Sequence, residues 1–315
     1  MRLQRLHERG ARRQYQGTLQ INVRRQFVFE DSYWQLQPRT GEEIKQGKLS
    51  VRFYDEEGVD AGGVTREWFS VLARQMFNPG YALFEPQAAD ALTYQPNKVR
   101  SCLLQRCDNA DNALQSSSVN EEHLSYFKFV GRIIGKAIYD QRVLEAYFSR
   151  FVYKHMLGKA VDHRDLESID PDYHKSLVWM LENDIDDVLD LTFSIERETF
   201  GVAEVIDLIP NGRNVPVTNE NKAEYVRLIA DQRLSTEIRD QIGALLSGLY
   251  EIVPKELLQI FHERELELLI SGLPEIDVEE WRAHTDYHQF SPSDPVIQWF
   301  WRCVRSFTQE ERAKV

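Results

Sequence analysis

Cysteine is scarce in this chain: 315 residues contain only Cys102, Cys107 and Cys303. Disulfide-stabilised secreted domains need more cysteines at more regular spacings, so this class is excluded and a reducing compartment is expected. We therefore expect a cytoplasmic protein, with the nucleus as a second location. Long apolar runs are lacking as well. Since no stretch approaches the ~20 apolar residues of a membrane-spanning helix, we expect no membrane partner.

Basic residues are outnumbered by acidic ones. Lys and Arg number 38 against 50 Asp and Glu, which gives a formal charge of -12 and an isoelectric point near 5.2. Nucleic-acid binding favours clustered positive charge, so we expect no nucleic-acid partner. The acids are concentrated in residues 161–200, which hold twelve Asp and Glu but only three Lys and Arg. Such a window steers a basic protein surface toward itself, or it is simply a well-solvated face.

The signatures of several enzyme classes are absent. The chain has no Gly-x-Gly-x-x-Gly or Gly-Lys-Ser/Thr phosphate loop, no Gly-x-Ser-x-Gly nucleophile and no His-Glu-x-x-His zinc motif. His284 and His288 are four residues apart, but nothing around them suggests further ligands, so two surface histidines are expected. We predict neither a metal site nor a cofactor.

None of the three cysteines has the sequence surroundings of a nucleophile, which must be accessible and held as a thiolate. Cys303 shares an apolar helical stripe with Trp299 and Phe300, so we expect a small, buried hydrophobic residue. Cys102 and Cys107 fall within residues 98–120, where the lack of apolar periodicity predicts a flexible surface insertion. We therefore predict no catalytic residue in this chain.

Apolar periodicity predicts an α+β fold that is predominantly helical. In the first half we expect a helix over 27–36, a strand over 49–54, a helix over 64–77, and a buried pair of helices over 124–148 that meet near Asp140. Gly131 and Gly135 are expected to allow close helix packing.

The second half begins with a helix over 173–183 and short strands over 189–195 and 204–208. We expect a hairpin-type turn at Asn211-Gly212 and a helix capped by Thr218. Further helices are predicted over 234–261, 261–270 and 295–307. The sequence contains no internal repeat.

Eight short stretches, taken in order, resemble the N-terminal lobe of HECT-type ubiquitin ligases, most closely the very large Mule-type members. They are Asn22-Val-Arg-Arg, Phe29-Glu-Asp-Ser-Tyr33, Glu57-Gly-Val-Asp-Ala-Gly-Gly-Val-Thr-Arg-Glu-Trp68, Met76-Phe-Asn-Pro79, His123-Leu-Ser-Tyr-Phe-Lys-Phe-Val-Gly-Arg132, Leu181-Glu-Asn-Asp184, Glu265-Leu-Glu-Leu-Leu-Ile-Ser-Gly272 and Ile297-Gln-Trp-Phe-Trp301. The resemblance implies a large helical subdomain, residues 1–160 and 233–315, and a small α/β subdomain, residues 161–232. In this family the small subdomain binds the ubiquitin-conjugating enzyme.

The resemblance also implies which residues form the groove for the conjugating enzyme. They are Tyr173, Leu177, Met180, Leu181, Leu189, Leu191 and Tyr225, with Asp186 and Asp187 placed to meet basic residues of the partner. The first four follow helical spacing and so share one stripe. A helix that buries itself against its own domain would show the same stripe.

A second, non-covalent ubiquitin-binding surface is implied by the same resemblance. Its residues would be Tyr81, Asn97 and Phe200. Exposed aromatic residues favour interface use, but these could equally fill a seam between subdomains.

Catalysis in HECT ligases depends on a cysteine in a C-lobe, which accepts ubiquitin as a thioester and passes it to a substrate lysine. This sequence ends at Val315 without a His-Thr-Cys-Phe-type motif. We therefore expect the C-lobe to be absent, the chain to be inactive alone, and protein substrates to be bound by regions outside it. The alternative is a non-catalytic adaptor or inhibitory domain that sequesters conjugating enzyme or ubiquitin.

Overall fold

The computed structural model describes residues 17–56, 62–87, 92–97, 116–199, 202–272, 276–288, 290–308 and 312. The chain divides into two compact units, residues 1–270 and 271–315. Among the described residues, none of the helices combines the length and apolarity required to cross a membrane.

The first unit begins with two parallel strands, β1 (Thr18–Val23) and β2 (Lys48–Phe53), in which Ile21 lies opposite Val51. Side chains alternate between buried and exposed along both strands, as expected of a sheet with one face on the core. The connection contains η1 (Arg25–Phe27), α2 (Val28–Leu36) and α3 (Gly41–Gln46). Thr40 and Glu43 form a capping box that fixes where α3 starts.

The next part of the first unit combines α4 (Gly63–Met76) and η2 (Pro79–Tyr81) with a short antiparallel pair, β3 (Phe84–Pro86) and β4 (Tyr94–Pro96). The helix α4 starts after Gly62, whose φ of +105° suits a glycine. Its inner face buries Trp68, Phe69 and Leu72 completely.

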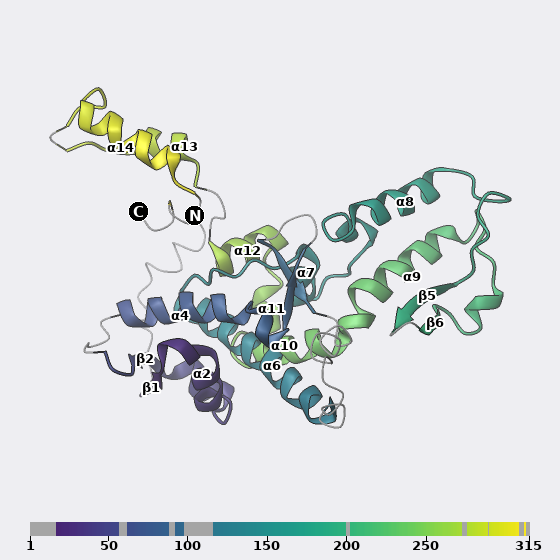
Figure 1. The fold of residues 1–315 in the computed structure, drawn as a ribbon, viewed down its shortest axis with the longest axis horizontal. Helices are drawn as coiled ribbons and strands as arrows, with labels where there is room; N and C mark the ends of the chain where they lie inside the picture. The colour runs from purple at the N-terminus through teal and green to yellow at the C-terminus, as the bar shows by residue number, and fades with distance from the viewer. Residues whose placement is uncertain are drawn as a thin grey trace. The chain divides into compact units, whose positions relative to one another are not determined.

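Two long helices form the centre of this unit: α6 (Ser116–Asp140) and α10 (Arg239–Tyr250). They lie side by side in Figure 1 and share the most extensive helix contact of the described chain. Two glycines allow the contact. A Cβ at Gly131 would lie 1.9 Å from the Leu245 carbonyl oxygen, and one at Gly248 would lie 1.9 Å from the Lys128 carbonyl oxygen. Close helix packing at Gly131 is thus confirmed.

Shorter helices surround this pair. They are α7 (Arg150–Leu157), η6 (Thr236–Ile238), α11 (Lys255–Leu258) and α12 (Glu263–Ser271).

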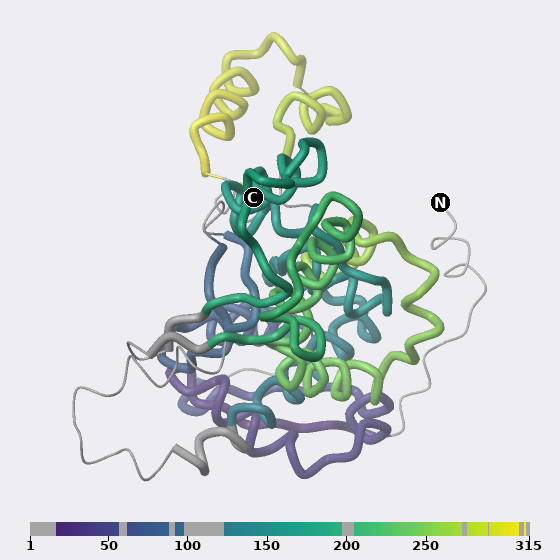
Figure 2. Tube along the Cα trace, turned by 90° about the vertical axis from the view of Figure 1, so that its right-hand side faces the viewer, coloured from purple at the N-terminus to yellow at the C-terminus, as the bar shows by residue number. Residues whose placement is uncertain are grey.

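The segment from residue 161 to residue 232 extends from one end of the first unit (Figure 1). It contains η4 (His163–Leu166), α8 (Pro171–Glu182), the antiparallel hairpin β5 (Ser194–Thr199) and β6 (Val202–Asp207), η5 (Gly212–Asn214) and α9 (Lys222–Leu234). Figure 2 turns this end toward the viewer. Two helices and a hairpin match the expected α/β composition, whereas the subdomain boundaries at 161 and 232 stay a prediction.

The second unit contains α13 (Val278–Ala283) and α14 (Pro295–Ser306). It has a small core of its own made by Val278, Trp301 and Val304. The Trp301 indole N–H donates to the Tyr287 hydroxyl at 2.7 Å.

The sequence placed most helices correctly but misjudged residues 141–149, which are not helical. Gln141 ends α6 with a φ of +56°, and side chains then alternate, with Leu144, Ala146 and Phe148 buried. This twofold alternation is typical of extended chain and was hidden within a strongly apolar stretch. The predicted loop over 98–120 is also partly wrong, since α6 already starts at Ser116. Residues 98–115 lie outside the described ranges.

Three details of residues 189–222 also differ from expectation. The strand β5 begins only at Ser194, and Asn211-Gly212 leads into η5 and does not connect two strands. The predicted cap at Thr218 was wrong, because α9 starts at Lys222 with Asn221 as its N-cap and no side chain caps it. Thr218 lies in the turn before the helix, where its carbonyl oxygen accepts the N–H groups of Asn221 and Lys222.

Candidate functional site

The helix α8 carries the largest group of predicted binding residues, and its ends are well defined. The Asp170 carboxylate accepts the backbone N–H of Tyr173 at 3.0 Å, and Pro171 occupies the first turn. At the other end, the Asn183 side-chain amide donates to the Trp179 carbonyl oxygen at 2.8 Å. The helix therefore has a fixed register, which decides which side chains face inward.

The inward side of α8 packs on α9. Leu177 and Met180 are 2% and 6% exposed, and Tyr225 of α9 is 6% exposed. The Tyr225 ring meets Phe193 edge-on with centroids 5.5 Å apart. These three predicted groove residues therefore form part of the subdomain's own core. This is the alternative explanation for the apolar stripe of the helix, in which it packs against its own domain.

Four further predicted groove residues lie at the margin of this core. Tyr173, Leu181, Leu189 and Leu191 are partly buried and pack against it. Asp186 and Asp187 are exposed. The structure thus brings the predicted groove residues into one apolar layer, in which the marginal leucines and Tyr173 are the members that a partner could reach.

Tyr173 and Tyr225 are both held as neutral phenols. Burial raises the pKa of Tyr225 to about 12, with a smaller contribution from Tyr173. Burial also raises the pKa of Tyr173, while the Arg233 guanidinium opposes the shift. That guanidinium lies 3.7 Å from the centre of the Tyr173 ring and pairs with Asp170 at 3.3 Å. Arg233 thereby ties the end of α9 to the start of α8.

The loop after α8 is fastened by Asn219, in an arrangement that we name the Asn219 clasp. The Asn219 side-chain oxygen accepts the Ile185 N–H at 3.1 Å, and its amide group donates to Asp184. The backbone N–H of Asn219 donates to the Asp186 carboxylate at 3.1 Å. Lys222 adds a bond from its ammonium group to the Asn183 carbonyl oxygen at 2.5 Å. The bond from Asn219, followed by that from the Asp186 N–H, lowers the pKa of Asp184.

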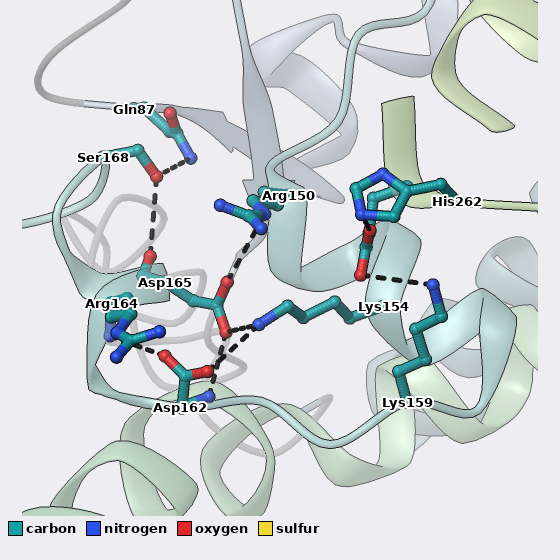
Figure 3. A network of polar contacts seen from close by, with 10 residues as sticks. Gln87, Arg150, Lys154, Lys159, Asp162, Arg164, Asp165, Ser168 and His262 are labelled. Carbon is teal, nitrogen blue, oxygen red and sulfur yellow. Dashed lines mark hydrogen bonds and ion pairs between the residues drawn. The ribbon is translucent and has the colours of Figure 1, made fainter. Parts of the chain in front are cut away.

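A buried ion pair joins the small subdomain to α7 (Figure 3). The Lys154 ammonium lies 2.6 Å from Asp165, whose side chain is 0% exposed, and 3.4 Å from Asp162. The Asp162 N–H donates to Asp165 at 2.9 Å, so the turn of η4 forms around the same carboxylate. Burial alone would raise the pKa of Asp162, but the Arg164 N–H and the Lys154 charge lower it. We name the group of Lys154, Asp162 and Asp165 the entry joint.

The chain leaves the small subdomain beside the place where it enters. The His155 imidazole bonds to the Leu234 carbonyl oxygen at 2.8 Å, so residues just outside 161 and 232 are in direct contact. A hollow of about 40 Å³ lies next to this contact, lined in part by Phe151, Leu166 and Ile238. Sites for small-molecule substrates are roughly ten times larger, so this hollow holds water at most.

The residues predicted to bind a second ubiquitin are placed differently from one another. Tyr81 is half-buried, with its ring 4.6 Å from Phe29, and burial raises its pKa, helped by a hydrogen bond to Glu30. Asn97 is 9% exposed, and its backbone bonds to Leu83 and to the Gln241 side chain. Phe200 lies outside the described residues.

Cys303 is exposed, and the expectation that it is buried was wrong. The buried side of α14 is the one that carries Trp301 and Val304. The apolar stripe in the sequence was broad enough to include both sides. His284 and His288 are exposed as expected, and no group of three or more potential metal ligands occurs within the described ranges.

Sequence reasoning missed two exposed apolar side chains on the small subdomain, Trp179 at 45% and Val188 at 63% exposure. The sequence around each residue could have indicated its exposure. Trp179 is a large aromatic residue on the otherwise polar face of α8, and Val188 is an apolar residue within an acidic run.

Comparison with known proteins identifies the family. Residues 70–315 match the sequence profile described as HECT-domain (ubiquitin-transferase). This chain belongs to the HECT family. The HECT chain is 56% identical to "E3 ubiquitin-protein ligase TOM1-like" of Neurospora crassa over 98% of its length, which is 7% of that protein.

Two relatives from other kingdoms are nearly as similar to the HECT chain. It is 50% identical to "E3 ubiquitin-protein ligase HUWE1" of Mus musculus over 99% of its length and 7% of that protein. It is 48% identical to "E3 ubiquitin-protein ligase UPL2" of Arabidopsis thaliana over 95% of its length and 8% of that protein. The HECT chain thus spans less than a tenth of the length of these relatives. The resemblance to the large Mule-type ligases and the α+β, predominantly helical HECT N-lobe fold are confirmed.

Proposed function

We propose that the HECT chain binds a ubiquitin-conjugating enzyme through residues 161–232 and acts as the N-lobe of a ubiquitin ligase. The observation that carries the proposal is the family match combined with a helix pair whose apolar margin, at Tyr173, Leu181 and Leu189, adjoins an acidic loop. An apolar margin offers contact area, and the acids favour rapid encounter with a basic surface.

Ubiquitin would be transferred twice while this chain holds the conjugating enzyme. A thiolate in the C-lobe attacks the thioester between ubiquitin and the conjugating enzyme; a new carbon–sulfur bond forms while the thiol of that enzyme leaves. A substrate lysine amine then attacks the new thioester and forms an amide, which releases the C-lobe thiol. The 315 residues contribute no cysteine to this relay. Substrate selection belongs to regions outside them, and the names of the relatives favour a ligase over an adaptor.

The entry joint and the bond between His155 and Leu234 support the proposal physically. Because polar contacts hold both connections between the small subdomain and the rest of the unit, a bound conjugating enzyme would keep a defined orientation. A fixed orientation lowers the entropic cost of bringing the thioester of the conjugating enzyme to the thiolate of the C-lobe.

The binding part is tested by titrating the chain with a panel of ubiquitin-conjugating enzymes. Leu181→Ala and Leu189→Ala should each weaken the tightest complex about 5-fold or more, because both truncate marginal apolar contacts without opening the core. Leu268→Ala is the control, since Leu268 is an exposed leucine on α12, which is not part of residues 161–232. Unchanged affinity in both test variants would refute the site.

The catalytic part is tested by mixing the chain with a ubiquitin-charged conjugating enzyme. We expect no reducible ubiquitin adduct on this chain. An adduct that disappears on replacing Cys102, Cys107 or Cys303 by serine would show that the relay includes a cysteine of these 315 residues.

A further inference from the structure

The outer face of α8 and the following loop expose apolar surface that the fold does not use. Trp179 and Val188 are 45% and 63% exposed, although every neighbouring apolar residue from Leu177 to Leu191 is at least half covered or buried. A solvent-exposed tryptophan and valine are costly to leave in water, at ~25 cal/mol per Å² of apolar area. Aromatic residues of this kind are the commonest anchors of protein interfaces.

The loop that carries Val188 is already in a fixed shape. The Asn219 clasp holds residues 183–186 through Asp184, Ile185 and Asp186. Asp187 then adopts a φ of +60°, a left-handed conformation that Asp tolerates better than most residues, and the N–H groups of Val188 and Leu189 both donate to the Ile185 carbonyl oxygen, at 3.2 and 3.1 Å. Because the loop is ordered before a partner arrives, binding loses little conformational entropy.

The loop between Trp179 and Leu191 carries charges of one sign. Residues 182–190 contain five acids, Glu182, Asp184, Asp186, Asp187 and Asp190, and no base. The clasp engages Asp184 and Asp186. Glu182, Asp187 and Asp190 are exposed and form no ion pair with any described residue.

We propose that Trp179 and Val188 determine which conjugating enzyme the chain accepts. They would contact an apolar side chain of that enzyme flanked by Lys or Arg, which the unpaired acids would attract. This inference rests on the proposed function and adds contacts outside the predicted groove residues. A second copy of this chain is the less favourable occupant, because it would bring five acids against five acids.

The test measures affinity and association rate of the 315-residue chain for each enzyme of the panel. Trp179→Ala should weaken the preferred complex at least 10-fold and Val188→Ser about 3-fold, with a changed rank order among the enzymes. Trp34→Ala is the matched control, because Trp34 is 63% exposed but lies on α2. It should leave every affinity unchanged.

A charge variant provides an independent measurement. Asp187→Asn combined with Asp190→Asn should slow association several-fold at low salt and flatten its salt dependence, with little change in dissociation. Both positions are exposed, so circular dichroism should show the native fold.

The outcomes separate the two proposals. If the unaltered chain binds no enzyme of the panel, both are overturned. If it binds, and Leu181→Ala and Leu189→Ala weaken binding while Trp179→Ala and Val188→Ser behave like Trp34→Ala, this inference is overturned and the proposed function stands. Self-association of the chain that Trp179→Ala abolishes would also overturn it.

Discussion

Replacing Gly131 by alanine should destabilise the protein strongly, although alanine is the better helix former. The new methyl carbon would lie 1.9 Å from the Leu245 carbonyl oxygen and 2.9 Å from the Leu249 nitrogen. Both obstacles are backbone atoms of α10, which cannot rotate away. Reaching ordinary contact requires α6 and α10 to separate by about 1.5 Å.

The magnitude follows from two opposing effects. Helix propensity favours alanine by ~1 kcal/mol. Overpacking a well-packed core costs about 1–3 kcal/mol where side chains can adjust. Moving the helices apart adds a cost, because each dispersion contact between two atoms is worth ~0.1–0.2 kcal/mol and a gap of about 0.5–1 Å loses a quarter to a half of it, over many atom pairs. Because helix must move against helix, the high end applies, and we expect a net loss of ~2 kcal/mol or more.

Gly243 provides a matched control on the same helix pair. It lies within α10, and a Cβ there would meet nothing within 4 Å. Gly243→Ala should therefore stabilise the protein by ~0.5–1 kcal/mol. The assay is urea unfolding followed by circular dichroism at 222 nm. If Gly131→Ala raised the midpoint as Gly243→Ala does, the close approach of the two helices would be refuted.

Three further predictions concern the small subdomain. Lys154→Met should lower the free energy of unfolding by ~3–5 kcal/mol, because it leaves the buried Asp165 charge with only the distant Arg150 guanidinium, at 3.9 Å, as an ion-pair partner. Lys154→Met with Asp165→Leu should recover most of the loss. Chemical denaturation measures both variants, and equal losses in the two would contradict the ion-pair argument. Burial raises the pKa of Tyr225, so the folded state keeps a phenol proton that the unfolded chain loses above pH 10. The contribution of Tyr225 to the free energy of unfolding is therefore fully present below pH 10 and falls toward pH 12. Tyr225→Phe should remove ~2 kcal/mol of this alkaline loss, and identical pH profiles of unfolding free energy for the two proteins would disprove the argument. Asn219→Ala should speed hydrogen exchange at the Ile185 amide at least 10-fold while amides in α10 stay unchanged, and an unchanged rate at Ile185 would show that the loop does not depend on the clasp.

The sequence predicted elements wherever periodicity was unambiguous. The strand at 48–53, the helix at 63–76 and the helix at 295–306 were each found to within about two residues. Periodicity failed at residues 141–149, because Leu144, Ala146 and Phe148 sit in a run so apolar that alternation and helical spacing both fit.

The predicted binding residues show a different limit. Spacing placed Tyr173, Leu177 and Met180 on one face of α8, and the structure has them there. It could not tell whether that face meets a partner or α9, because both uses require the same residues. Leu177 and Met180 proved to be interior, and the exposed Trp179 stands on the opposite side. Long-range packing decides between these uses.

The contact between His155 and Leu234 has a consequence for how the chain folds. His155 and Leu234 are 79 positions apart, and the chain between them forms a closed insertion. Its hairpin of β5 and β6 joins neighbouring residues, and its bond from Arg233 to Asp170 spans 63 positions, whereas the central core depends on partners as distant as Arg132 and Glu251, which are 119 positions apart. Short loops close faster than long ones, so we expect the insertion to fold first. Because it lies between α6 and α10 in the sequence, its closure should bring these two helices within reach of each other. The segment proposed to receive the conjugating enzyme would then also be the part that starts the folding of its own host.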